Sequence, residues 1–373
     1  MSDITLILLA AGESSRFSFP VKKQWLRIGD EPLWQFVTNR FMSTERFAKA
    51  IVTAHADETD YMRAHGDYVV VEGGASRQHS LRNALEHVKT PFVMVSDVAR
   101  ACVDAELIER LVEAKGEADC IVPVLAMHDT VVYRGETIDR SAVFRVQTPQ
   151  LSRTAALREA LRNETEYTDE SSAIVAAGGS RLFVGGDEHA RKLTTLADLP
   201  ALKCLQPPKN VTLCGTGFDV HAFDTEGTLV LCGVEIEHPV GFKAHSDGDV
   251  AIHALIDALL GAAGMGDIGT LFPDTDEAYA GIDSAVLLAR TCERLRRFGF
   301  VVVNVDIAVA AQTPRLAPYI AAMRRRLADI LAIAPVRVSV KATTTERLGF
   351  VGRKEGVAVM ASATLNYLNW TRP

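Results

Sequence analysis

ITLILLAAGESSR, residues Ile4–Arg16, begins with an apolar run and then turns at once to a loop of small and charged residues. The apolar run Ile4–Leu9, ended by a turn, is typical of a strand that is buried on both faces. Such strands belong to parallel sheets, where the loops at the carboxyl ends of the strands gather along one edge. No basic segment precedes the run, so we expect a strand here rather than a signal peptide.

Four further β-rich runs alternate with helical patterns as far as about Leu196, and this alternation predicts βαβ units around a mostly parallel sheet. The runs are Ala50–Val52, Tyr68–Val71, Phe92–Val95 and Cys120–Leu125. The pattern ends at Leu199–Asn210, where Pro207 and Pro208 can continue neither a helix nor a central strand. We therefore expect two domains, residues 1–208 and 209–373.

The second part predicts a smaller α+β unit. Its expected helices are Asp247–Ala263, Asp283–Arg297 and Leu316–Leu331. Its expected strands are Val211–Cys214, Val301–Ala311, Val336–Ala342 and Val357–Leu365.

Composition agrees with two globular domains. The chain has 373 residues, 48% of them apolar and 23% charged, and domains average roughly 150 residues. Its 40 basic and 47 acidic residues give a net charge of −7, which excludes a general electrostatic surface for nucleic acid or anionic membranes. No stretch approaches the roughly 18 apolar residues of a membrane span. The six cysteines lack CxxC spacing, which argues against a disulfide framework and favours a reducing cytoplasm.

Polar residues follow the first strands at places suited to a nucleotide. The loop at Gly12 contains Arg16 and is followed by Lys23, so backbone N–H groups can face phosphates while the cations neutralise charge. The segment Gly73–Ser80 opens a helix, and Asp97 follows a buried strand, where Mg²⁺ on a nucleotide would need an oxygen ligand. Taken singly, each feature also fits a turn, a helix cap or a surface charge.

In this order, and with Thr130, Arg140 and Lys192 further along, the motifs resemble the 2-C-methyl-D-erythritol 4-phosphate cytidylyltransferase family across residues 3–200. The resemblance implies a Rossmann-like nucleotidyltransferase domain that uses Mg²⁺ or Mn²⁺ and moves CMP from CTP to the acceptor. It implies that Arg16 and Lys23 stabilise the charge at the reacting α-phosphate. Asp97 is implied as the carboxylate on the metal side, and the implied substrate-binding residues are Gly12, Gly74, Ser80, Asp97, Thr130, Arg140 and Lys192.

The second part contains residues of the kinds that bind zinc. Asp219 and His221 are two positions apart, so on an extended segment they point to the same face. A following helix would place Asp249, His253 and Asp257 on one stripe. An Asp/His/His set with an open fourth position suits a catalytic zinc ion. The alternative is a helix cap plus a histidine that is hydrogen-bonded within the core.

Four ordered motifs resemble 2-C-methyl-D-erythritol 2,4-cyclodiphosphate synthase over about residues 211–368: GFDVHAF, AHSDGDVAIHALIDALLGAAGMGDIG, LFPDTD and KATTTERLGFVGR. The resemblance implies zinc on Asp219, His221 and His253, and Mg²⁺ or Mn²⁺ on Glu346 with the substrate diphosphate. It implies that His245 and Thr344 stabilise the transition state. The remaining implied substrate contacts are Ser246, Asp267, Ile268, Gly269, Asp274, Thr343, Thr345, Phe350 and Arg353.

Together the resemblances predict a bifunctional enzyme of the methylerythritol phosphate route to isoprenoid precursors. Two other hypotheses stay open. One is a generic sugar-phosphate nucleotidyltransferase fused to a zinc phosphohydrolase. The other is an active cyclase fused to a decayed nucleotidyltransferase-like scaffold, because Ser14 and Ser96 stand where the first family usually has Gly and His.

The resemblances also carry expectations about partners. The substrates would be CTP and methylerythritol phosphates, with no nucleic acid and no membrane. The cyclase family implies a homotrimer with sites between subunits and the transferase family a dimer, which together close as a hexamer. A kinase must act between the two reactions; the chain has no GxxxxGK[ST] loop, so we expect the kinase to be a separate chain and a candidate partner.

Overall fold

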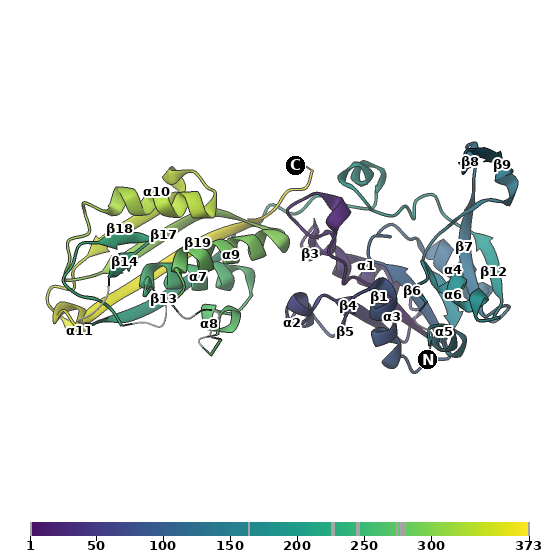
Figure 1. The fold of residues 1–373 in the computed structure, drawn as a ribbon, viewed down its shortest axis with the longest axis horizontal. Helices are drawn as coiled ribbons and strands as arrows, with labels where there is room; N and C mark the ends of the chain where they lie inside the picture. Colours follow the sequence, from purple (N-terminus) through teal and green to yellow (C-terminus); the bar gives the residue numbers. More distant parts are fainter. Residues whose placement is uncertain are drawn as a thin grey trace. The chain divides into compact units, whose positions relative to one another are not determined.

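The computed structural model describes residues 2–162, 165–224, 228–243, 247–273, 275–276, 279 and 281–371. The chain divides into two compact units, Met1–Pro207 and Pro208–Pro373, each with its own main sheet (Figure 1). No helix in these described ranges is long and apolar enough to cross a membrane.

The first unit is built on a sheet whose order is β10-β7-β11-β6-β1-β4-β5, with β12 paired to β7. Strand β1 is buried at every residue and pairs in parallel with β4 and β6, as its apolar run predicts. Strand β11 is antiparallel to β6 and β7. The bounds are β1 Ile4–Leu9, β4 Lys49–Ala54, β5 Val69–Glu72, β6 Phe92–Asp97, β7 Cys120–Ala126, β10 Phe144–Val146, β11 Gln150–Arg153 and β12 Arg181–Gly185.

Helices cover this sheet and complete its core. Ile7, Val93 and Val122 of the strands form one buried cluster that also includes Leu81 of α3 and Leu157 of α5. The helices are α1 Leu33–Met42, α2 Thr59–Arg63, α3 Arg77–Glu86, α4 Ala105–Glu113, α5 Thr154–Ala160 and α6 Glu170–Ala176, with 3₁₀ turns at Ser15–Phe17, Lys23–Trp25, Ala56–Glu58, Arg140–Ala142 and Leu196–Ala201.

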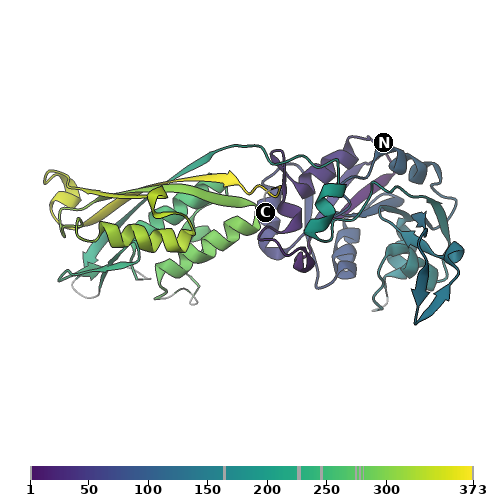
Figure 2. The ribbon, with the colours of Figure 1, turned by 90° about the horizontal axis from the view of Figure 1, so that it is seen from above.

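Two small ribbons accompany the main sheet of this unit. Strands β2 Arg27–Ile28 and β3 Glu31–Pro32 precede α1. Strands β8 Val131–Tyr133 and β9 Glu136–Ile138 form a hairpin that extends away from the rest of the unit (Figures 1 and 2).

One expectation about the cysteines is wrong. Cys102 and Cys204 form a disulfide, with their Cα atoms 5.6 Å apart, although 102 positions separate them in sequence. Spacing along the chain says nothing about two cysteines that the fold brings together from the loop after β6 and from the end of the unit. The other four cysteines form no disulfide.

The second unit has a sheet of order β16-β13-β19-β17-β18, in which the pair β17 and β18 is parallel. Helices α9 and α10 run along one side of the long strands (Figure 2). The strands are β13 Leu213–Asp224, β14 Leu229–Leu231, β15 Val234–Ile236, β16 Gly241–Phe242, β17 Phe300–Ala310, β18 Val338–Thr343 and β19 Gly356–Tyr367. The helices are α7 Val250–Ala263, α8 Ile268–Leu271, α9 Ser284–Arg297, α10 Ile320–Leu331 and α11 Gly349–Gly352, with a 3₁₀ turn at Pro335–Arg337.

Strand β13 is longer than the sequence predicts, because its glycines serve packing rather than a turn. A Cβ atom on Gly217 would lie 2.0 Å from the carbonyl oxygen of Ala254, and one on Gly215 would lie 2.1 Å from that of Ala258. Both contacts are far too short for real atoms, so only glycine lets the strand lie this close to α7. The strand therefore continues past Cys214 to Asp224.

Candidate active sites

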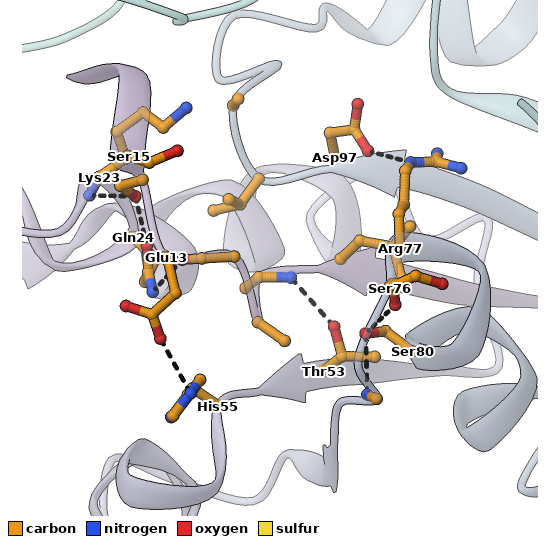
Figure 3. A pocket seen from close by; sticks show the side chains of 18 of the residues that line it. Glu13, Ser15, Lys23, Gln24, Thr53, His55, Ser76, Arg77, Ser80 and Asp97 are labelled. Atoms are coloured by element: carbon orange, nitrogen blue, oxygen red, sulfur yellow. Dashed lines mark hydrogen bonds and ion pairs between the residues drawn. The ribbon is translucent and has the colours of Figure 1, made fainter. Parts of the chain in front are cut away.

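The first unit contains a pocket of about 550 Å³ at the carboxyl ends of its parallel strands (Figure 3). Neighbouring parallel strands deliver their following loops to one edge, so the loops after β1, β4 and β6 converge there. Seven residues predicted from sequence line this pocket: Gly12, Arg16, Lys23, Gly74, Ser80, Asp97 and Lys192.

Asp97 is held between two cations. Its Oδ1 accepts a hydrogen bond of 3.0 Å from Nε of Arg77, and its Oδ2 one of 2.7 Å from Nζ of Lys192. Burial disfavours the charged carboxylate, but these two cations outweigh it and lower the pKa of Asp97 to about 2. Asp97 is therefore an anion at neutral pH.

Lys23 lies among other positive charges. Its Nζ donates to the carbonyl oxygen of Leu193 at 3.2 Å. Burial, together with the nearby Lys192 and Arg16, lowers the pKa of Lys23. These three cations surround a volume that would favour a polyanion.

Ser14 fixes the loop that leads to Lys23. Its φ of 57° lies in the left-handed region, which a glycine would occupy more easily. Its hydroxyl compensates by accepting from the backbone N–H of Lys23 at 3.1 Å and donating to Oε1 of Gln24 at 3.2 Å. The serine at this position is thus compatible with an ordered loop.

The segment before α3 is also preorganised. Ser76 caps the helix by accepting from the N–H of His79. The hydroxyl of Ser80 accepts from the N–H of Gly74 at 3.0 Å and donates to the carbonyl oxygen of Ser76 at 2.9 Å. These bonds hold Gly74 and Ser80 at the wall of the pocket.

Thr130 and Arg140 are not among the residues that line this pocket. Both are exposed and lie at the base of the β8–β9 hairpin, where Nη1 of Arg140 donates to the carbonyl oxygen of His128 at 2.5 Å. Within a single chain, the structure does not bring them together with Lys192.

The second unit contains a cluster of three possible metal ligands. Asp219 and His221 lie on β13 and His253 on α7, and their ligand atoms all lie within 4.8 Å of one another. Oδ2 of Asp219 is 3.3 Å from Nε2 of His221 and 3.4 Å from Nδ1 of His253. The close packing of β13 on α7 brings the three side chains together.

Hydrogen bonds orient both histidine rings. Nδ1 of His221 is 3.0 Å from the carbonyl oxygen of Gly248, and Nε2 of His253 is 3.0 Å from the hydroxyl of Ser284. That hydroxyl donates in turn to Oδ1 of Asp247. Each ring thereby keeps its other nitrogen directed at Asp219, as metal-binding histidines require. Burial opposes the charge on Asp219, but bonds from both histidines outweigh it and lower its pKa.

The predicted helical stripe differs at one position, since His253 and Asp257 are four residues apart on α7 and Asp249 precedes the helix. Helix α7 begins at Val250, so Asp249 is its cap, and the Asp249 carboxylate accepts four backbone N–H groups while fully buried. Asp257 instead accepts from the N–H of Ile268 at 2.8 Å. Only His253 of the three joins the cluster.

The remaining predicted residues of the second unit lie outside this cluster. Asp267 caps α8, which contains Ile268 and Gly269. The others of known position are Thr343, the last residue of β18, and residues of the mostly exposed segment that follows: Thr344, Thr345, Glu346, Phe350 and Arg353. The predictions for His245, Ser246 and Asp274 fall outside the described residues.

Comparisons with known proteins cover the whole chain. The family model for 2-C-methyl-D-erythritol 4-phosphate cytidylyltransferase matches residues 4–204, and that for the YgbB family matches residues 212–366. The chain is 57% identical to the bifunctional enzyme IspD/IspF of Sulfurimonas denitrificans over 99% of this chain and 96% of that one. The structure of the bifunctional IspDF from Campylobacter jejuni matches with a TM-score of 0.91 and 47% identity over 100% of both chains. The chain belongs to the bifunctional IspD/IspF family.

Membership of the IspD/IspF family fixes the general function. The protein is a bifunctional enzyme of the methylerythritol phosphate pathway, with a cytidylyltransferase domain followed by a cyclodiphosphate synthase domain. The hypothesis of a decayed first domain is not favoured, because whole-chain relatives such as that of Nitratiruptor sp., 52% identical over 100% of both chains, have the bifunctional name.

Sequence reasoning missed several residues of the IspD-type pocket, namely Gln24, Thr53, His55 and Arg77. Thr53 and His55 had a usable signal, since they end a buried parallel strand next to β1. Gln24 did not, because its role depends on bonds to Gly12 and the buried Glu58 that only the fold reveals.

The IspF-type cluster depends on the contact of β13 with α7, so we predict a large effect of Gly217→Ala. The added methyl group must push the strand away from the helix, which costs about 1–3 kcal/mol or more and separates Asp219 and His221 from His253. We expect a lower melting temperature and loss of bound metal, measured by thermal denaturation and elemental analysis. Gly261→Ala on α7 is the control, because its methyl group meets no atom within 4 Å. Equal behaviour of the two variants would contradict this account.

Proposed function

We propose that the pocket of the first unit transfers CMP from CTP to 2-C-methyl-D-erythritol 4-phosphate. The observation that supports this most is the convergence of Arg16, Lys23, Lys192 and Asp97 on one pocket. An oxygen of the acceptor phosphate attacks the α-phosphorus, the bond to the bridging oxygen breaks, and pyrophosphate leaves with the electron pair. Arg16 and Lys23 offset the charge that gathers on the α-phosphate, which is the main requirement of such transfers.

A divalent cation fits this pocket. Asp97 is an ionised carboxylate at the pocket wall, and each of its oxygens has spare acceptor capacity beyond its single bond to Arg77 or Lys192. In our proposal Asp97 holds Mg²⁺ or Mn²⁺ on the triphosphate, directly or through water. The metal would neutralise phosphate charge, while Lys192 would hold the acceptor.

For the second unit we propose that Asp219, His221 and His253 hold zinc. The donor set of one carboxylate and two imidazoles matches catalytic zinc sites, and both rings have the partners such ligands need. Zinc would draw the two anionic groups of the substrate together. The 2-phosphate attacks the β-phosphorus of the cytidine diphosphate and CMP leaves, giving 2-C-methyl-D-erythritol 2,4-cyclodiphosphate.

Phosphorus NMR of the products tests both reactions. With CTP, Mg²⁺ and the acceptor we expect pyrophosphate and a cytidine diphosphate ester, and UTP should compete poorly. With the 2-phosphorylated ester we expect CMP and a cyclic diphosphate. Products of simple hydrolysis would instead favour a phosphohydrolase.

A separate kinase chain supplies the phosphorylation between the two steps. We place all three activities in the cytoplasm, although the disulfide is unusual there.

We further propose that both sites are completed by other copies of the chain. In the second unit, the proposed Glu346 site and the residues around it are exposed and lie outside the zinc cluster. One face of the same sheet exposes Phe218 and Met360, at 61% and 58%, and these residues are register partners on β13 and β19. Exposed apolar faces of this kind mark subunit contacts, which supports a trimer through this unit.

The first unit offers a second contact. The hairpin that extends from it exposes Val132 and Tyr133, and Thr130 and Arg140 lie at its base. A dimer that exchanges hairpins would let these two residues reach the neighbouring pocket.

Combining the twofold and threefold contacts predicts a hexamer. Sedimentation equilibrium of the full chain should give the mass of six chains. A sample containing only monomer or only trimer would contradict the hexamer.

A further inference from the structure

A fully buried carboxylate lies behind the pocket of the first unit. Glu170 is the first residue of α6, its side chain is 0% exposed, and it is not among the residues that line the pocket. Its Oε1 is 2.6 Å from Nη1 of Arg77. Arg77 does line the pocket and extends toward Asp97, as Figure 3 shows. Glu170 is therefore connected to the pocket through a single guanidinium group.

The two carboxylates fix the orientation of that guanidinium group. Nη1 of Arg77 faces Glu170 and its Nε faces Asp97, so two different nitrogens of one rigid plane are each bound to an anion. Burial raises the pKa of Glu170 and the charge of Arg77 opposes this effect. Removing Glu170 from this pair would leave the partly buried charge of Arg77 uncompensated. A change at Glu170 should therefore also alter how Arg77 contacts Asp97.

The charges also balance around Asp97. Arg77 and Lys192 both contact Asp97, which would leave the group with one excess positive charge. Glu170, which does not line the pocket, removes that excess by pairing with Arg77. Without Glu170, the full charge of Arg77 would be directed at Asp97 and would compete with a cation for its oxygens.

We propose that Glu170 is a positioning residue for cytidylyl transfer, acting through Arg77 to orient Asp97 and to keep its oxygens available to the metal on the nucleotide. This inference rests on the proposed role of Asp97. It goes beyond that role because Glu170 itself touches neither substrate nor metal. The competing interpretation is an ion pair that stabilises the fold and has no bearing on the metal.

The test compares Glu170→Gln with Asp169→Asn in the full chain. The first change keeps the shape of the side chain and removes its charge. The second removes a neighbouring carboxylate whose Oδ2 accepts from Gln150 at 2.8 Å and from Ser171 at 2.6 Å. Titration with Mn²⁺, with and without CTP, measures the affinity of the site for the metal without turnover. The electron paramagnetic resonance signal of the free ion reports how much Mn²⁺ remains unbound. The Mg²⁺ dependence of pyrophosphate release measures the metal requirement of the site during turnover.

For Glu170→Gln we expect CTP-dependent Mn²⁺ affinity to fall about 10-fold, and kcat for pyrophosphate release to fall about 10–100-fold, the usual range for residues behind a metal ligand. Glu170→Asp, which keeps the charge, should recover part of this loss. Asp169→Asn should change the Mn²⁺ affinity less than about twofold, because it does not contact Arg77. CMP release by the second unit should stay unchanged in all variants and reports the amount of folded enzyme.

The variant Asp97→Asn distinguishes a failure of the inference on Glu170 from a failure of the proposed role of Asp97. If Asp97→Asn weakens metal binding and Glu170→Gln does not, the inference on Glu170 is overturned and the proposed function stands. If neither variant affects metal binding, the proposed role of Asp97 fails as well. Should Glu170→Gln not fold, Arg77→Lys keeps the charge but loses the forked geometry. Arg77→Lys must then lower the CTP-dependent Mn²⁺ affinity, as expected for Glu170→Gln. An unchanged affinity would overturn the inference.

Discussion

We expect His253→Ala to abolish metal binding by the second unit and cyclisation, and to leave cytidylyl transfer at the wild-type rate. The physical reason is that catalytic zinc sites use three protein ligands, and this change removes one of the three that we propose, leaving Asp219 and His221. Because a bound metal supplies several kcal/mol of charge stabilisation, we expect CMP release to fall more than about 1,000-fold. Zinc content after dialysis and CMP release measure the two effects.

His238→Ala is the matched control for this prediction. His238 belongs to the same unit and packs on the ring of Phe223, but it is not part of the metal cluster. The control should keep its bound metal and its cyclase activity. Loss of both enzymatic activities in His253→Ala would contradict the independence of the two sites.

Lys23→Ala should have the converse effect, with cytidylyl transfer lost and cyclisation kept. Lys23 lines the first pocket beside Arg16 and Lys192, where we propose that the α-phosphate gathers negative charge during transfer. Removing one such group costs about 100–1,000-fold in kcat. Pyrophosphate release measures the loss. Lys89→Ala, which removes an exposed lysine outside the pocket, should be neutral, and an equal loss there would contradict the assignment.

The lowered pKa of Lys23 adds a pH dependence to this prediction. The residue acts as a cation, so activity is retained below its pKa in the folded protein and is lost as pH rises through that value. Because burial and neighbouring cations lower this pKa, the alkaline decline begins at a lower pH than an ordinary lysine would give. Lys23→Arg keeps its charge at high pH, so its profile should lack that decline. An identical profile for both proteins would show that another group titrates.

The sequence predicts the parallel strands well because their signal is local. Strand β1 agrees with its expected bounds, since a run of apolar residues reports burial on both faces. Strand β13 continues past its predicted end at Cys214, because Gly215 and Gly217 let it pack closely on α7, and that contact joins residues distant in sequence. The disulfide between Cys102 and Cys204 was missed for the same reason, since it depends on contacts distant in sequence.

In the candidate sites too, the sequence predicts what depends on local patterns and misses what depends on contacts distant in sequence. Residues at the ends of neighbouring parallel strands were expected to meet, and Gly12, Lys23 and Asp97 do line one pocket. Helical periodicity predicts Asp249, His253 and Asp257 on one stripe; His253 and Asp257 do lie on α7, whereas the helix begins at Val250 and has Asp249 as its cap. Helical spacing identifies the stripe correctly only when the first residue of the helix is known.

The charge arrangement around Asp97 could not be predicted from the sequence. Glu170 follows Thr168 and Asp169 in a segment that reads as a helix start, and nothing in that segment indicates Arg77 as its partner. Only the packing of α6 and α3 around the sheet brings the two together. Buried ion pairs of this kind are found from structure and then tested by charge-neutral substitutions.

The most direct test of the whole account is pyrophosphate release by the purified full chain with CTP, Mg²⁺ and 2-C-methyl-D-erythritol 4-phosphate. We predict release that requires the acceptor and disappears in Lys23→Ala, from the same preparation that releases CMP in the cyclase assay. A folded protein with an active cyclase that releases no pyrophosphate would contradict it, and the first unit would then have a different acceptor or a scaffolding role.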